Sequence, residues 1–166
     1  LNKDTGVAHV QAGVRMGRLE RQGRSSTSPS RPLGRELRCY PSTWAPATIG
    51  GFVGGGFGGV GSIRNGVLWD GFLTSVTVME MKPEATTHKL LGDDLLGFIH
   101  AYGMSGIIVE LEVNLAPAMS WEESVMSFPT LEDALRFGYE LAKDDAFDKR
   151  LICINEWPIP TFFKPL

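Results

Sequence analysis

The sequence predicts an α+β fold, and three segments carry that prediction. Residues 106–116 (GIIVELEVNLA) alternate apolar and mostly polar side chains, the period-two pattern of a strand with one buried face. Residues 130–143 place apolar side chains along one helical stripe, with Thr130 as N-cap and Asp133 three positions later. Residues 7–13 (VAHVQAG) indicate a short strand that ends at glycine, and residues 14–22 allow a helix.

Shorter elements are expected between these segments. Residues 23–34 are rich in Ser, Pro, Gly and Arg, which is typical of an exposed loop. Residues 72–81 are rich in β-forming side chains, and residues 83–87 are expected to be a turn or a hairpin loop. Residues 95–99 allow a short helix, because two aspartates precede them where acidic side chains suit a helix start.

The C-terminal part differs in its order of elements. Residues 124–128 and 150–156 are expected to be strands that flank the helix of residues 130–143. A strand-helix-strand order of this kind predicts a domain boundary near residues 116–121. We therefore expect two domains, residues 1–117 and residues 118–166.

Composition narrows the class of protein. The chain has 166 residues, of which 43% are hydrophobic and 21% charged, as in a soluble globular domain. Its net charge of -3 offers no basic excess to neutralise phosphates, so we expect no nucleic-acid partner.

Cysteine usage and the chain ends add two further expectations. Cys39 and Cys153 are far apart and belong to no CxxC pair, which favours two reduced cysteines in a cytoplasmic protein. No charged and apolar leader pattern is visible. The chain starts without Met and stops on apolar residues, which suggests a fragment.

Residues 47–66 (ATIGGFVGGGFGGVGSIRNG) are the most unusual segment. A membrane span is rejected because each helical Gly costs about 1 kcal/mol relative to Ala and few strongly apolar residues remain. Residues 56–61 satisfy G-x-G-x-x-G, but no buried strand precedes them and Asn65-Gly66 indicates a turn, so a dinucleotide fingerprint is rejected too.

Two interpretations of the glycine segment remain. One is a glycine-rich surface loop without a ligand. The other is a packed loop whose consecutive N–H groups cradle a phosphate, with apolar side chains such as Phe52 and Val53 beneath. Ordering so many glycines is entropically costly, which gives the second interpretation a modest lead.

Three motifs in the same order resemble a known flavoprotein family. They are the segment PSTWAPATIGG (residues 41–51) with the later Gly58-Gly59 and Arg64-Asn65-Gly66, the segments GDDLL (92–96) and GMSGII (103–108), and the strand of residues 7–13. Together they resemble the second half of the FAD-binding domain of the vanillyl-alcohol oxidase / p-cresol methylhydroxylase flavoproteins, in the glycolate oxidase and D-lactate dehydrogenase branch.

The resemblance implies a fold, a cofactor and a set of contact residues. The fold would be the second subdomain of a PCMH-type FAD-binding domain, an antiparallel-rich sheet with flanking helices, over residues 1–117. Residues 118–166 would begin an α+β substrate domain. The residues implied to contact FAD are Ser42, Thr43, Ala47, Thr48, Gly50, Gly51, Gly55, Gly58, Gly103, Gly106, Ile107 and Ile108.

The resemblance also implies an activity for the parent protein. That protein would be an FAD-dependent oxidoreductase acting on a 2-hydroxy acid or a similar CH–OH substrate, whereas this chain by itself is expected to be inactive. A homo-oligomer or an electron-acceptor partner stays open, and no integral membrane segment is expected. The alternative is a domain that keeps the fold and binds no flavin. Phe52 and Asn65 depart from the family pattern, and the half of the domain that holds the FAD pyrophosphate has no counterpart in the sequence.

The sequence assigns no catalytic acid or base and no metal site. His9, in an expected strand, and His88, in an expected turn, read as structural or exposed. His100 stands just before the second glycine motif and could lie near the flavin. The acidic residues between 144 and 148 read as a solvated turn rather than as metal ligands.

Overall fold

The computed structural model describes residues 1–162. It divides the chain into two compact units, Leu1–Ser120 and Trp121–Leu166. The two predicted domains and their roles stay a prediction. Each unit is described by itself.

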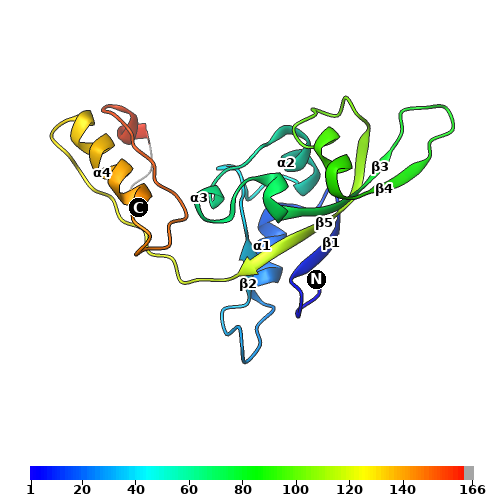
Figure 1. The fold of residues 1–166 in the computed structure, drawn as a ribbon, viewed down its shortest axis with the longest axis horizontal. Helices are drawn as coiled ribbons and strands as arrows, with labels where there is room; N and C mark the ends of the chain where they lie inside the picture. The colour runs from blue at the N-terminus through cyan, green and yellow to red at the C-terminus, as the bar shows by residue number, and fades with distance from the viewer. Residues whose placement is uncertain (163–166) are drawn as a thin grey trace. The chain divides into compact units, whose positions relative to one another are not determined.

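The first unit is built on a five-stranded antiparallel sheet (Figure 1). The strands are β1 (Val7–Gln11), β2 (Arg35–Leu37), β3 (Leu73–Met79), β4 (Thr87–Leu90) and β5 (Ile107–Pro117). The order is β1-β5-β3-β4, and β2 pairs with the end of β5 beyond β1. β5 is therefore the central strand, and the predicted α+β class is confirmed.

The alternating segment of residues 106–116 is confirmed as a strand, but its apolar face is only partly covered. Leu111, Val113 and Leu115 are buried. Ile107 and Val109 belong to the same face and are 48% and 36% exposed. The first half of the strand therefore presents apolar side chains to the surface.

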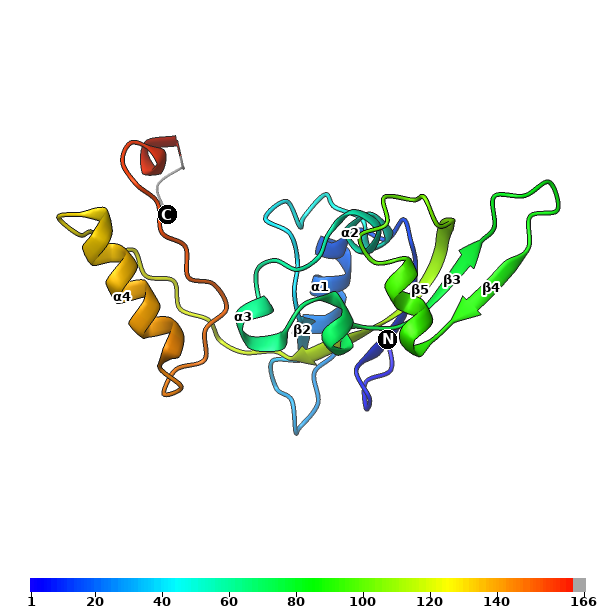
Figure 2. The same ribbon diagram turned by 45° about the horizontal axis from the view of Figure 1, so that its top comes forward.

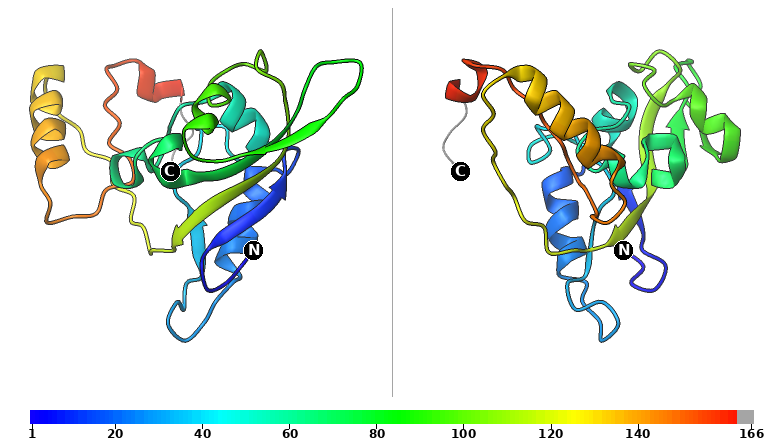
Figure 3. Two further views of the ribbon diagram at one scale, coloured as in Figure 1. Left: turned by 45° about the vertical axis from the view of Figure 1, so that its right-hand side comes forward. Right: turned by 60° about the vertical axis from the view of Figure 1, so that its left-hand side comes forward.

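Two helices cover the sheet. α1 (Met16–Arg24) packs on β2, and α2 (Ile49–Gly55) packs on β5, as the ribbon views show (Figure 3). A one-turn helix, α3 (Ser62–Asn65), follows. The buried side chains that join the helices to the sheet are Met16 and Leu19 of α1, Ile49, Phe52 and Val53 of α2, and Val76, Leu111 and Val113 of the sheet.

The glycine segment is thus not a loop throughout, because residues 49–55 form the helix α2. The expectation of a non-helical segment was wrong there, and the reason is local. Thr48 provides an N-cap, and Ile49, Phe52 and Val53 fall at helical spacing on one buried face. Burial of these three side chains outweighs the low helix propensity of four glycines.

The hairpin of β3 and β4 confirms the expected strand of residues 72–81 and the turn after it (Figure 2). The second strand of this hairpin, β4, had no predicted bounds, since its sequence THKL carries little apolar pattern. A 3₁₀ helix, Gly92–Gly97, replaces the short helix expected at residues 95–99.

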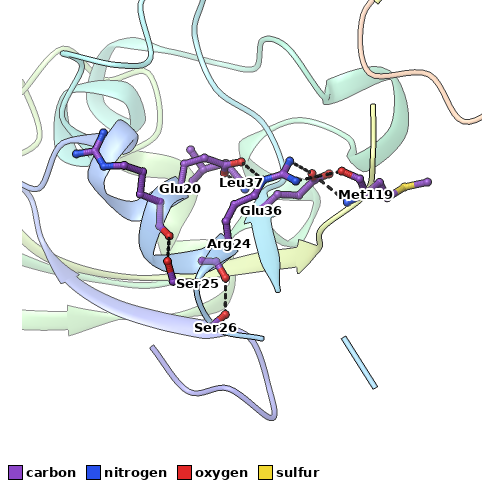
Figure 4. A network of polar contacts seen from close by, with 9 residues as sticks. Glu20, Arg24, Ser25, Ser26, Glu36, Leu37 and Met119 are labelled. Carbon is purple, nitrogen blue, oxygen red and sulfur yellow. Dashed lines mark hydrogen bonds and ion pairs between the residues drawn. The ribbon is translucent and has the colours of Figure 1, made fainter. Parts of the chain in front are cut away.

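A polar network joins α1 to β2 and to the segment after β5 (Figure 4). The guanidinium of Arg24 donates to Glu20 Oε1 (3.0 Å), to Glu36 Oε2 (2.6 Å) and to the carbonyl of Met119 (3.1 Å). Glu36 is only 1% exposed, and its Oε2 also accepts the N–H of Met119 at 3.3 Å. The network thereby ties three segments together through one buried carboxylate.

The second unit contains α4 (Leu131–Lys143), which confirms the clearest predicted helix. Thr130 caps it by accepting the N–H of Asp133 at 3.1 Å. The strands expected at residues 124–128 and 150–156 are wrong, because both segments are irregular in the structure. Ile152 and Ile154 pack instead against Gly138 of α4. Their alternation therefore reflects packing on this helix and not strand pairing.

Candidate functional site

A groove of about 550 Å³ opens in the first unit where the end of β1, helix α2 and the loop before β5 meet. Its lining residues are Ala12, Gly13, Thr48, Gly50, Gly51, Gly54, Gly55, Tyr102, Gly103, Gly106, Ile107 and Ile108. All of them are uncharged, and most are glycines. Backbone therefore forms much of the wall, and the groove suits an uncharged ligand surface.

The first turn of α2 is fully hydrogen-bonded within the protein. Its donors and acceptors are Ile49 N to Val14 O (2.9 Å), Gly50 N to Ala12 O (2.9 Å), Gly51 N to Thr48 Oγ1 (3.2 Å) and Phe52 N to Thr48 O (2.9 Å). A helix N-terminus binds an anion through N–H groups that have no other acceptor. The expected N–H cradle for a phosphate was therefore wrong at this turn.

The glycines of α2 differ in whether packing within the protein requires them. A Cβ at Gly50 would lie 2.5 Å from the Cβ of Ala12, so close packing against the end of β1 requires glycine there. A Cβ at Gly55 would meet no atom within 4 Å, and one at Gly54 only the end of Ile108 at 3.9 Å. A Cβ at Gly13, which also lines the groove, would likewise meet no atom within 4 Å.

These open positions matter because glycine within a helix costs about 1 kcal/mol relative to alanine. Packing within the protein does not require glycine at positions 13, 54 and 55. A Cβ at Gly13 or Gly55 would meet open space, one at Gly54 only the end of Ile108, and all three glycines line the groove. This arrangement fits a ligand that contacts the backbone closely.

The loop before β5 forms the second wall and is tied to the end of α2. His100 N donates to the carbonyl of Val53 (2.9 Å), and Tyr102 N donates to the carbonyl of Gly54 (2.7 Å). Gly103 and Gly106 adopt positive φ values of 76° and 145°, which glycine tolerates. The two glycine motifs, about fifty residues apart in the sequence, thus face one groove.

The structure brings most of the predicted contact residues together. Thr48, Gly50, Gly51, Gly55, Gly103, Gly106, Ile107 and Ile108 all line the groove. The remaining predicted residues lie elsewhere. Ser42 and Thr43 are exposed in a turn, and Ala47 accepts the N–H of Met16 at the start of α1. Gly58 packs against Ser62 and Val67.

Four lining residues were not predicted: Ala12, Gly13, Gly54 and Tyr102. Ala12 and Gly13 are the last two residues of the motif VAHVQAG (residues 7–13), which carries part of the family resemblance. Their place in this motif was the sequence signal that could have identified them. Gly54 adjoins the predicted Gly55. No pattern in the sequence marked Tyr102, because its place in the groove depends on how the loop turns.

Other polar groups lie away from this groove. His9 pairs with Glu110 at 3.1 Å and His88 with Glu80 at 3.3 Å, both at exposed positions. A smaller pocket of about 290 Å³ lies beside the β3–β4 hairpin and contains none of the predicted residues. Within residues 1–162 the structure shows no cluster of three metal-ligating side chains and no helix long and apolar enough to span a membrane.

An antiparallel sheet, flanking helices and a glycine-walled groove define an α+β domain with an open ligand-sized groove. Comparison with known families agrees, because a family model described as an FAD binding domain matches residues 1–89. The chain belongs to this family of FAD-binding domains, and the predicted cofactor and PCMH-type fold are confirmed. No curated protein matches the chain.

Solved structures support the same fold. Two structures of an alkyldihydroxyacetonephosphate synthase match with TM-scores of 0.56 and 0.53 at 21% and 20% sequence identity. Each match covers 70% of this chain and 20% of the synthase, so the chain spans about a fifth of the length of these proteins. At this level of identity the likeness concerns the fold, and the glycolate oxidase branch stays a prediction.

Proposed function

We propose that the groove holds the flavin end of FAD in a flavin-dependent oxidoreductase whose substrate is a 2-hydroxy acid or a similar CH–OH compound. The observation that carries the proposal is the set of open glycine positions at Gly13, Gly54 and Gly55. They leave room for a planar ring against the backbone, where side chains would obstruct it.

The uncharged wall favours the isoalloxazine and ribityl portion over the pyrophosphate. All lining residues are uncharged, and the N–H groups of the first turn of α2 are already used. A pyrophosphate carries negative charge and needs free donors or cations nearby. Thr48 and the backbone of the groove can bind and orient the ring system instead, while apolar Ile107 and Ile108 limit water.

Within the parent enzyme, FAD would supply the hydride-accepting chemistry, and the protein would supply position and environment. We propose that this chain forms one wall of the site and is inactive without the rest of the protein. A reducing cytoplasm is the proposed location, since Cys39 and Cys153 are both free thiols.

Ligand binding by the purified chain tests the proposal. Titration of flavin fluorescence should show binding of FAD and riboflavin, and competition with ADP should be weak. Gly55→Leu should abolish binding, because its side chain would enter the groove, while leucine suits a helix. Gly97→Leu is the matched control, because its Cβ position is equally open and lies outside the groove.

Two outcomes would count against the proposal. If ADP displaces FAD while riboflavin does not bind, the groove does not hold the flavin end. If no flavin binds to the full-length protein and none raises its thermal midpoint, the domain keeps the fold without the cofactor. For the substrate, failure of glycolate and D-lactate to reduce the flavin of the full-length protein would exclude 2-hydroxy acids of this size.

A further inference from the structure

His100 and Tyr102 are non-glycine residues in the left-handed region of the backbone, with φ values of 58° and 52°. This conformation costs an L-residue roughly 1–2 kcal/mol. Neither side chain is buried in return, since His100 is exposed and Tyr102 is 70% exposed. Strained backbone residues cluster at active sites and ligand-binding sites, so these two residues motivate a hypothesis of function.

The hydrogen bonds of His100 define its protonation pattern. Its Nδ1 lies 3.1 Å from the carbonyl oxygen of Gly55, which can only accept, so Nδ1 carries the proton. In the neutral imidazole the other nitrogen, Nε2, is then an acceptor. The Tyr102 hydroxyl lies 3.5 Å from this Nε2, a long contact in which the hydroxyl is the only possible donor when the imidazole is neutral.

The direction of this bond determines what Tyr102 offers to the groove. A hydroxyl that donates its proton to His100 keeps its oxygen lone pairs available as acceptors. Tyr102 lines the groove beside Gly54 and Gly103. The ring of His100 is held further by edge-to-face contacts with Tyr102 (4.8 Å) and Phe57 (6.1 Å).

We propose that Tyr102 and His100 form the proton-accepting pair of this site, a role that rests on the proposed oxidation of a CH–OH substrate. The substrate O–H bond breaks and its proton passes to the Tyr102 oxygen, while the Tyr102 proton passes to His100 Nε2. FAD, when bound, would accept the hydride that the substrate carbon loses as its carbonyl forms. Tyr102 is the catalytic residue, and His100 acts through it.

The geometry of the pair can be tested in the 166-residue chain without any flavin. Nitrogen NMR of labelled histidine at about pH 8.5, where an ordinary imidazole is neutral, should show a protonated Nδ1 and an unprotonated Nε2 for His100. Tyr102→Phe should shift the Nε2 signal and leave Nδ1 nearly unchanged. A proton on Nε2, or an unchanged Nε2 signal in the variant, would overturn the proposal.

The chemical role requires the full-length flavoprotein and rapid anaerobic reduction by glycolate or D-lactate. Tyr102→Phe should lower the rate constant of flavin reduction by roughly 100-fold when the protein is saturated with FAD. His100→Asn should lower it by about 10-fold or more, because Asn can still donate to Gly55 and tolerates a left-handed backbone, yet offers no Nε2. Tyr139→Phe, at an exposed position of α4, is the matched control and should change nothing.

The outcomes separate this inference from the proposed function. A wild-type protein that is reduced at the same rate as Tyr102→Phe overturns the role of the pair and leaves the proposed function standing. A wild-type protein that binds FAD and is reduced by neither hydroxy acid overturns both the substrate class and the role of the pair.

Discussion

The Cα of Gly50 faces Ala12 so closely that a Cβ on Gly50 would lie 2.5 Å from the Cβ of Ala12. The N–H of Gly50 also donates to the Ala12 carbonyl at 2.9 Å. This contact sets the position of α2 against the end of β1. Gly55, five residues further along the same helix, lines the groove with no neighbour within 4 Å of its Cβ position.

The two glycines should therefore respond to alanine in opposite directions. Gly50→Ala should lower the free energy of unfolding by about 1–3 kcal/mol, because the added methyl overpacks the contact with Ala12. Gly55→Ala should raise it by about 0.5 kcal/mol, because alanine reduces the backbone entropy lost on folding. Urea denaturation followed by circular dichroism measures both values. A stability loss of similar size in both variants would contradict the view that only Gly50 is fixed by packing.

The buried carboxylate of Glu36 provides a second test. Glu36→Gln should lower the free energy of unfolding by about 1–3 kcal/mol, because Arg24 and the N–H of Met119 lose a charged acceptor. Glu132→Gln is the matched control, since its pair with Arg136 lies on the surface of α4 and should contribute less than about 1 kcal/mol. Equal losses in the two variants would show that burial of Glu36 adds nothing.

Sequence patterns predicted the elements that depend on local information. Helix α4 carries its own cap at Thr130 and its own apolar stripe, and β5 carries its alternation, so both were predicted close to their observed bounds. Residues 150–156 alternate in the same way, yet they form no strand. Alternation specifies a strand only where a partner supplies the ladder, and here Ile154 packs on Gly138 of α4 instead.

The candidate site was likewise predicted where a local sequence motif specifies it and missed where tertiary contacts specify it. The glycines at 50, 51, 55, 103 and 106, which line the groove, were found from the motifs that carry the family resemblance. The helical state of residues 49–55 was not predicted, since it depends on burial of Ile49, Phe52 and Val53 in the tertiary core. Tyr102 reaches the groove through the bond of its N–H to Gly54 O, a tertiary contact without a sequence signal.

The two cysteines should differ sharply in reactivity. Cys39 is buried, and this burial raises the pKa of its thiol to about 12, so it stays protonated and inaccessible at neutral pH. Cys153 is exposed. Titration of the native chain with a disulfide reagent at about pH 8 should therefore modify Cys153 quickly, and Cys39 only after unfolding. The Cys153→Ser variant is the control, and rapid modification of that native variant would contradict the burial of Cys39.

Glu112, at the centre of β5, should make stability depend on acid pH. Its Oε2 accepts from Ser75 Oγ at 2.6 Å and from Lys89 Nζ at 2.9 Å, and these two bonds hold the pKa of the carboxyl below its ordinary value. Because the unfolded state then takes up this proton more readily than the folded state, the contribution is complete above the ordinary carboxyl pKa. It is lost as the pH falls through the lowered folded value.

Denaturation midpoints measured from about pH 7 down to about pH 3 test this linkage. Glu112→Gln should be less stable than the wild type at neutral pH, and the difference should shrink as the solution is acidified. Glu84→Gln, at an exposed position of the β3–β4 loop, is the control and should follow the wild-type curve. Other carboxyls, such as Glu80, titrate in both proteins, so the difference between the two curves isolates Glu112. Parallel curves for the wild type and Glu112→Gln would mean that the bonds from Ser75 and Lys89 do not stabilise the charged form.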